Sequence, residues 1–251
     1  MKLNIEASVT VITPTIGKPE LADAINSVIN QTYKNLKYLI VIDGPDYAAD
    51  AYKMIPLQMQ DRIKVVTLAE NTGGNGFYGH RVYAAFPHLI NTEYICFLDE
   101  DNWFEPNHVK SLIDTIEPNR LDWAYSLRNI YTPEKNFVAQ DNCESLGKWP
   151  VYWSINNKEP QYLVDTSSYC FRTNFLKEVA HIWHHGWGGD RHFYNILTQN
   201  MKHTNYDTSG KYTLNYRLDE QVEKKYGDIN FFGTGNQITE RHYGGFPWRK
   251  I

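Results

Sequence analysis

The chain has 251 residues, 42% of them apolar, and carries a formal net charge of −4 with a pI of about 6.1. This apolar content excludes a disordered chain, and the lack of a long basic run argues against a nucleic-acid partner. The length fits one large α/β domain or two small ones, and it is long enough to bury a substantial core.

The first half of the chain alternates between predicted strands and predicted helices. Apolar runs predict strands at residues 9–13, 36–42, 63–68 and 94–98, and helical patterns are expected at 19–29, 77–90 and 109–116. Strands that alternate with helices predict a parallel sheet with right-handed crossovers and helices on its faces.

The second half is expected to be less regular. Residues 129–162 contain three prolines and resemble a long excursion, and the chain after about residue 202 is polar, Tyr-rich and weakly periodic. A strand is expected at 165–171 and helices at 174–183 and 190–199. No repeat or linker marks a boundary, so we expect a single domain over 1–251, with halves of about 1–105 and 106–251.

Polar side chains stand where three of the predicted strands end. These are the segment 13–15, Asp43, and the consecutive carboxylates Asp99, Glu100 and Asp101. In open α/β sheets, ligands bind at the carboxyl ends of the strands, so these groups should meet at one edge of the sheet.

The acidic triplet 99–101 is the strongest local signal. Like charges this close repel, and a divalent cation relieves the repulsion, because carboxylate oxygens are the ligands that Mg²⁺ or Mn²⁺ prefers. A solvated acidic turn or a calcium-like structural site are the alternatives. The strand-end position favours a metal that also binds phosphate oxygens.

Four motifs over roughly residues 8–105 resemble family 2 glycosyltransferases, whose nucleotide-sugar-binding fold is called GT-A. The motifs lie at 9–15, 41–44, 71–76 with 79–81, and 99–101. The resemblance implies an α/β, Rossmann-like domain with a mostly parallel sheet flanked by helices. Residues 1–105 would form its nucleotide-sugar-binding half and 106–251 its acceptor-binding half. It further implies an inverting enzyme, a nucleotide-diphosphate sugar donor with UDP favoured, and Mn²⁺ or Mg²⁺ as cofactor.

The same resemblance assigns roles to individual residues. The donor-binding positions are Thr13, Pro14, Thr15, Asp43, Asn71, Arg81, Asp99, Glu100 and Asp101, with Asp99 and Asp101 as metal ligands. Many members of the family carry a second acidic residue after the equivalent of Asp43, where this chain has Gly44.

A carboxylate must also accept the proton of the attacking hydroxyl. Asp190, in the segment Trp187-Gly188-Gly189-Asp190, is our candidate for this general base. Helix stability alone would also explain an acidic residue in a first helical turn. The resemblance also implies that Asp165 and Ser167 line the sugar and acceptor pocket, where Trp187, Gly188 and Gly189 are expected to join them.

Some members of the fold use a later histidine as a further metal ligand. The resemblance makes His242 the candidate for that role, with His203 as second choice.

Two other functions stay open at this point: a nucleotidyltransferase and a non-catalytic nucleotide- or sugar-binding relative. A nucleotidyltransferase would need a Gly-rich phosphate loop, and the segment 13–18 contains only Gly17. The acceptor would be a carbohydrate, free or linked to lipid or protein. Three scattered cysteines and the absence of an apolar leader favour a cytoplasmic location with at most peripheral membrane contact.

Overall fold

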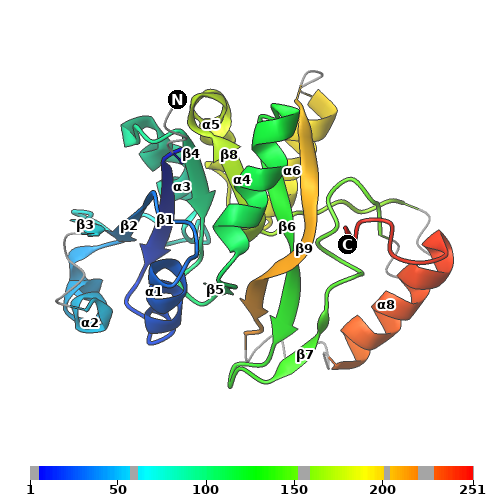
Figure 1. Cartoon of the computed structure of the whole chain (residues 1–251). Coiled ribbons are helices and arrows are strands. Elements are labelled where there is room, and N and C mark those ends of the chain that lie inside the picture. Colours follow the sequence, from blue (N-terminus) through cyan, green and yellow to red (C-terminus); the bar gives the residue numbers. More distant parts are fainter. Residues whose placement is uncertain (1–5, 57–61, 152–158, 201–203, 220–228, 251) are drawn as a thin grey trace.

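The computed structural model describes residues 6–56, 62–151, 159–200, 204–219 and 229–250. Within them, nine strands form one sheet in the order β3-β2-β1-β4-β8-β6-β9-β5, with β7 added beside β6 (Figure 1). The strands are β1 Val9–Thr15, β2 Leu36–Ile42, β3 Ile63–Thr67, β4 Tyr94–Phe97, β5 Trp103–Phe104, β6 Trp123–Tyr131, β7 Phe137–Gln140, β8 Tyr169–Arg172 and β9 Tyr206–Arg217.

The predicted α/β class with a mostly parallel sheet is confirmed. Strands β1 to β4 pair in parallel, and β6 and β9 run in the same direction as they do. The antiparallel members are β5, β7 and β8. The helices are α1 Leu21–Ile29, α2 Ala48–Met54, α3 His80–Ala85, α4 His108–Asn119, α5 Thr173–Val179, α6 Gly189–Asn195 and α8 Ile229–Tyr243.

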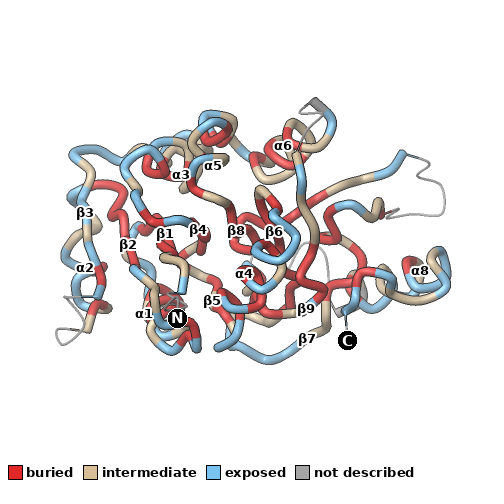
Figure 2. The backbone as a smooth tube through the Cα atoms, turned by 45° about the horizontal axis from the view of Figure 1, so that its top comes forward, coloured by how far each residue is buried: buried red, intermediate tan, exposed pale blue. Residues whose placement is uncertain are grey.

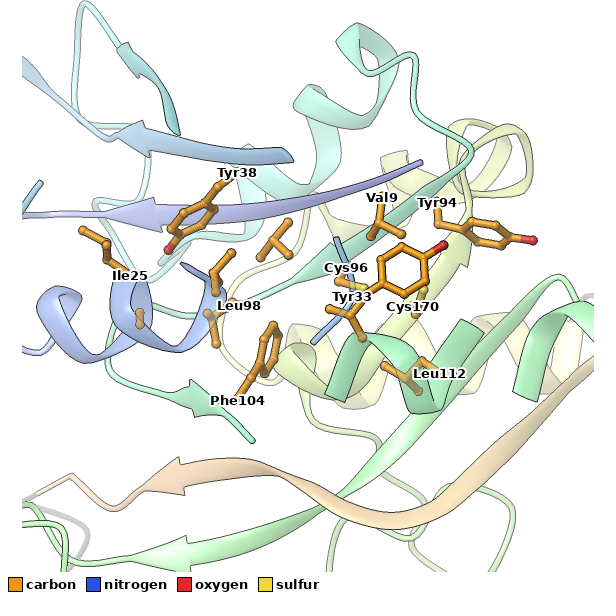
Figure 3. Close-up of a cluster of buried hydrophobic side chains, with 14 of the residues drawn as sticks. Val9, Ile25, Tyr33, Tyr38, Tyr94, Cys96, Leu98, Phe104, Leu112 and Cys170 are labelled. Atoms are coloured by element: carbon orange, nitrogen blue, oxygen red, sulfur yellow. The ribbon is translucent and has the colours of Figure 1, made fainter. Parts of the chain in front are cut away.

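Alternating side chains of each central strand point to opposite faces of the sheet and build two cores. On one face, Val9 and Val11 of β1 join residues of α1, α2 and α4, and Figure 3 shows part of this cluster with Ile25 and Leu112. On the other face, Ile12 joins residues of α3, α5 and α6. The result is a helix–sheet–helix arrangement in which the buried residues concentrate along the sheet (Figure 2).

The second half is more regular than its sequence indicates. Neither β6 nor the twelve-residue β9 was expected, yet they pair in parallel along most of their length. Polar side chains make β9 hard to predict from the sequence, but in the fold they have hydrogen-bond partners. Asn215 contacts Asn129 and Glu105, and Thr213 contacts His108. Because each buried polar group is hydrogen-bonded, a polar strand is stable inside the sheet.

Other boundaries in the chain also shift. The helix expected at 77–90 begins at His80 and continues as a 3-10 turn, Phe86–Leu89. The strand expected at 165–171 begins only at Tyr169, after a 3-10 turn, Thr166–Ser168. Helix α8 was not predicted. Among the described residues, no helix combines the length and the apolar character that crossing a membrane requires.

Candidate active site

The end of β4 meets the ends of β1 and β2 at one edge of the sheet, as expected for parallel neighbours. The turn Thr166–Ser168 reaches the same edge from the second half, because β8 pairs with β4. This edge therefore combines the acidic triplet with residues separated from it by more than sixty positions in the sequence.

Asp99 is held from two sides. Its Oδ1 accepts a hydrogen bond of 2.8 Å from the hydroxyl of Tyr83 in α3, and its Oδ2 accepts one of 3.1 Å from the hydroxyl of Ser167. Burial, with the nearby charges of Asp101 and Asp165, raises the pKa of Asp99 to about 7. Asp99, an expected metal ligand, and Ser167, an expected pocket residue, are thus in direct contact.

Glu100 points into the fold. Its carboxylate accepts from the hydroxyl of Thr15 and from the backbone N–H groups of Ile16 and Lys18, at 3.3 and 3.1 Å for the latter two. Burial raises the pKa of Glu100 in spite of these donors. Glu100 therefore fixes the loop after β1, a role that the resemblance did not predict for it or for Thr15.

Asp101 is the member of the triplet that faces outward. Its side chain is 39% exposed, and the Lys18 ammonium lies 3.5 Å from its Oδ2. The backbone carbonyl of Asp101 accepts from Nε of Arg217 at 3.0 Å. The carboxylate is accessible while the backbone behind it is fixed.

These contacts bear on the expected metal site. Within the described residues, no group of three or more His, Cys, Asp or Glu side chains is arranged to hold a metal ion. Mg²⁺ is typically bound through one or two carboxylates plus substrate phosphates. The two carboxylates of Asp99 and Asp101 fit that requirement.

His242 does not lie near the carboxylates of Asp99 and Asp101. It lies in the last turn of α8, where its ring packs against Tyr243, whose hydroxyl donates to the carbonyl of Pro150. Figure 1 shows α8 at the far side of the molecule from β4. His203 lies outside the described residues.

Asp43 anchors the glycine-containing loop that follows β3. Its carboxylate accepts from the N–H groups of Thr72 and Gly73, both at 2.7 Å, and the amide of Asn71 donates to its carbonyl at 2.9 Å. Gly44 has φ of +125°, which favours glycine, so an acidic residue at this position would be strained. Gly44, where this chain departs from the family pattern, thus suits its backbone conformation.

The donor-side residues Thr13, Pro14 and Arg81 differ in accessibility. Thr13 is buried and accepts from the hydroxyl of Tyr38, while Pro14 is buried against Gly79. The guanidinium of Arg81 lies 3.6 Å from the ring centroid of Phe77 and donates to the carbonyl of Thr72. Its buried Nε has no hydrogen-bond partner among the described atoms. Of these three, Arg81 has a donor left for a ligand.

The segment that carries Asp190 packs against the first residue of α3, His80. Gly189 has no room for a side chain, since an added Cβ would lie 2.6 Å from the ring of His80. The same ring contacts the carbonyl of His185 through Nδ1 at 2.8 Å. Gly188 has φ of +77°, and Trp187 beside it is 83% exposed. His80, for which the sequence offered no role, thus joins the two halves of the site.

A buried arginine lies behind this acidic edge. Arg128 of β6 is 4% exposed and pairs with Asp141, Glu144 and Asp165, at 2.7 Å for Asp141 and 2.8 Å for Asp165. Burial raises the pKa of Asp165 although Arg128 opposes the shift, and the charge of Asp190 contributes to the increase. Asp165 in turn raises the pKa of Asp99, so the carboxylates of both halves belong to one electrostatic site.

The fold and this edge define the class of protein: an α/β domain of GT-A type whose acidic triplet ends the fourth strand. The chain matches the model of Glycosyl transferase family 2 over residues 10–178, which is more than half of its length. The chain belongs to glycosyl transferase family 2, and the resemblance drawn from the four motifs is confirmed.

Curated relatives agree with this assignment. Glycosyltransferase GlyA of Streptococcus pneumoniae serotype 4 is 28% identical over 128 residues, which are 48% of this chain and 16% of that protein. The uncharacterized glycosyltransferase MJ1057 of Methanocaldococcus jannaschii is 26% identical over 140 residues, 51% of this chain and 47% of that protein. The matches therefore cover less than half of either relative.

Solved structures of S. aureus TarS, residues 1–349, share the fold. The complex with UDP-GlcNAc has a TM-score of 0.59 and 17% identity, covering 85% of this chain and 59% of that one. The complex with UDP has a TM-score of 0.58 and 16% identity, covering 93% and 69%. At this identity the likeness establishes a common GT-A-like fold.

Proposed function

We propose that this protein is an inverting glycosyltransferase that moves a sugar from a UDP-linked donor to an acceptor hydroxyl, assisted by Mn²⁺ or Mg²⁺. The observation that carries the proposal is the division of roles in the triplet. Tyr83 and Ser167 hold Asp99, Glu100 fixes the loop after β1, and Asp101 presents an accessible carboxylate at the sheet edge where GT-A proteins bind donors.

The choice of donor is supported by the family and by the charges at the edge. TarS has been crystallised with UDP-GlcNAc and has a similar fold. Lys18 beside Asp101 and the unpartnered Nε of Arg81 supply positive charge for a diphosphate. A cation held by Asp101 and Asp99 would neutralise charge that develops on the leaving diphosphate.

In this proposal Asp190 takes the proton of the attacking hydroxyl. It lies at the start of α6, where its Oδ1 accepts from the N–H of Arg191 at 2.7 Å. Its charge contributes to the raised pKa values of Asp165 and Tyr169. These influences on Asp165 and Tyr169 support the choice of Asp190 as the base. A base aligned on the acceptor typically contributes about 10²–10⁴-fold to the rate.

The acceptor side is proposed to begin at Trp187. An aromatic ring that is 83% exposed offers a flat apolar surface on which a sugar ring can stack, three residues before the proposed base. The acceptor would then be a carbohydrate, either free or linked to lipid or protein.

A pair of measurements tests the proposal. Binding of UDP is measured by isothermal titration with and without Mn²⁺, and turnover is measured by UDP release from UDP-sugars with an acceptor panel. Asp190→Asn should lower turnover at least about 10²-fold and leave the Kd for UDP within about twofold. Asp114→Asn, an exposed α4 residue paired with Lys110, is the matched control and should change neither.

The outcomes separate the alternatives. Wild-type protein that binds no nucleotide in the presence of Mn²⁺ would refute the donor assignment. Binding without any sugar release would favour a non-catalytic relative. Equal loss of binding and turnover in Asp190→Asn would remove Asp190 from the role of base.

A further inference from the structure

Arg217, the last residue of β9, contacts three separate parts of the fold. Its Nε donates to the carbonyl of Asp101 at 3.0 Å, one terminal nitrogen donates to the carbonyl of Pro133 at 3.2 Å, and the other pairs with Asp23 of α1 at 2.6 Å. Its side chain is 10% exposed. The planar guanidinium thus has a donor directed at each of three elements, which a lysine ammonium on a flexible stem would not reproduce.

The backbone of Arg217 adds to the same attachment. Its N–H donates to Oδ1 of Asn102 at 3.0 Å, and its guanidinium lies 5.2 Å from the ring centroid of Trp103. Asp101, Asn102 and Trp103 are therefore all fixed by one residue that lies 116 positions away from Asp101 in the sequence.

This attachment matters because it fixes the backbone that carries the carboxylate of Asp101. Asp99 and Glu100 are positioned by other groups, whereas the exposed side chain of Asp101 has only the Lys18 ammonium, at 3.5 Å, among its described ion pairs. Its direction therefore depends on the backbone that carries it. Arg217 is the side chain that bonds that backbone carbonyl.

We propose that Arg217 is a positioning residue for Asp101, and that the affinity of the donor–metal complex depends on it. The proposal rests on the proposed function, in which Asp101 binds the cation that bridges to the diphosphate. Arg217 lies outside the residues 10–178 matched by the family model, so the second half of the chain would tune donor binding.

An ordinary structural anchor would affect stability alone. A positioning residue must also change a property of the metal–nucleotide complex when the protein is fully folded. The distinguishing measurement is the Kd for Mn²⁺ in the presence of UDP, followed by the electron paramagnetic resonance signal of free Mn²⁺, which disappears on binding. It requires no sugar transfer.

Arg217→Lys is the test variant, and Arg172→Lys is its matched control. Arg172 likewise donates from Nε to a backbone carbonyl, that of Leu121, and lies near a carboxylate and over an aromatic ring, Glu117 and Tyr94. We expect Arg217→Lys to raise the Kd for Mn²⁺ in the UDP complex about tenfold, and the control to leave it within about twofold.

Asp23→Asn supplies a second variant if Arg217→Lys fails to fold, because it removes the charge of one anchor of the guanidinium and keeps the arginine. It should raise the same Kd about threefold. A folded Arg217→Lys with the wild-type Kd would overturn the proposal, as would an unchanged Asp23→Asn if it alone folds. Wild-type protein without Mn²⁺-dependent UDP binding would instead refute the proposed function, so the two failures are distinguishable.

Discussion

Replacing Arg128 by methionine should produce a large, pH-dependent loss of stability. The variant keeps an apolar stem of similar length and removes the charge that pairs with Asp141, Glu144 and Asp165. The side chains of Asp141 and Asp165 are 0% and 7% exposed, so their charges would remain buried without a counterion. Breaking a buried pair in this way typically costs about 3–5 kcal/mol.

Two features of the site set the magnitude within that range. Asp141 also accepts from the N–H groups of Cys143, Glu144 and Ser145, which reduces the cost of its charge. Asp165 has fewer backbone donors, and its pKa is already raised by burial in the presence of Arg128. We therefore expect a loss near the middle of the range, about 4 kcal/mol at about pH 7.5.

The pH dependence follows from the same charges. Without Arg128, the folded-state pKa values of Asp165 and Glu144 rise further above their ordinary values of 3.8 and 4.5. Between the raised and the ordinary values the folded state binds more protons than the unfolded state. Its stability then increases as the pH falls, by up to about 1.4 kcal/mol per pH unit for each group. The deficit of the variant should therefore be smaller at about pH 5.

Urea unfolding of both proteins at the two pH values gives the measurement. Arg172→Met is the control, because the Arg172–Glu117 pair is partly exposed on both sides and such pairs contribute about 0–1 kcal/mol. A deficit for Arg128→Met below about 1 kcal/mol, or one that is equal at both pH values, would refute the assignment of Arg128 as the counterion of these carboxylates.

Two further substitutions test other contacts. Glu100→Gln should lower the free energy of unfolding in urea by about 1–2 kcal/mol, because a carboxamide cannot accept from all three donors of the loop after β1. An unchanged urea midpoint would contradict that role of Glu100. Gly189→Ala should cost about 1–3 kcal/mol, because its Cβ meets the ring of His80. Gly233→Ala in α8, where nothing lies within 4 Å, should be neutral or stabilising, and equal effects of the two alanines would argue against the clash.

The first four strands and the edge they form could be predicted from the sequence. Strands β1, β2 and β4 are buried on both faces, so they appear as apolar runs, and parallel pairing dictates that their ends meet. Strands β6 and β9 could not be predicted in the same way. Polar residues such as Arg128, Asn129 and Asn215 look like loop residues until their hydrogen-bond partners are known.

The roles of individual site residues were harder to predict than their location. The sequence places Asp99, Glu100 and Asp101 together but cannot tell which of them points outward, because that depends on Thr15, Tyr83 and Ser167 in distant segments. The pairing of Arg128 with Asp165 could not be predicted from the sequence either, since the two residues are 37 positions apart.

The charges around the edge explain why a cation belongs with the donor in the proposed reaction. The charges of Asp101 and Asp165 raise the pKa of Asp99, and the charge of Asp190 raises the pKa of Asp165. The nearby Arg128 is already paired with carboxylates of its own, including Asp165. A diphosphate approaching this edge would meet these carboxylates, with Lys18 paired to the carboxylate of Asp101. A divalent ion arriving with the diphosphate would offset this repulsion, and the diphosphate oxygens would complete the ligand shell that the protein carboxylates begin. Donor affinity should therefore depend on the cation more steeply than on any single basic residue of the edge.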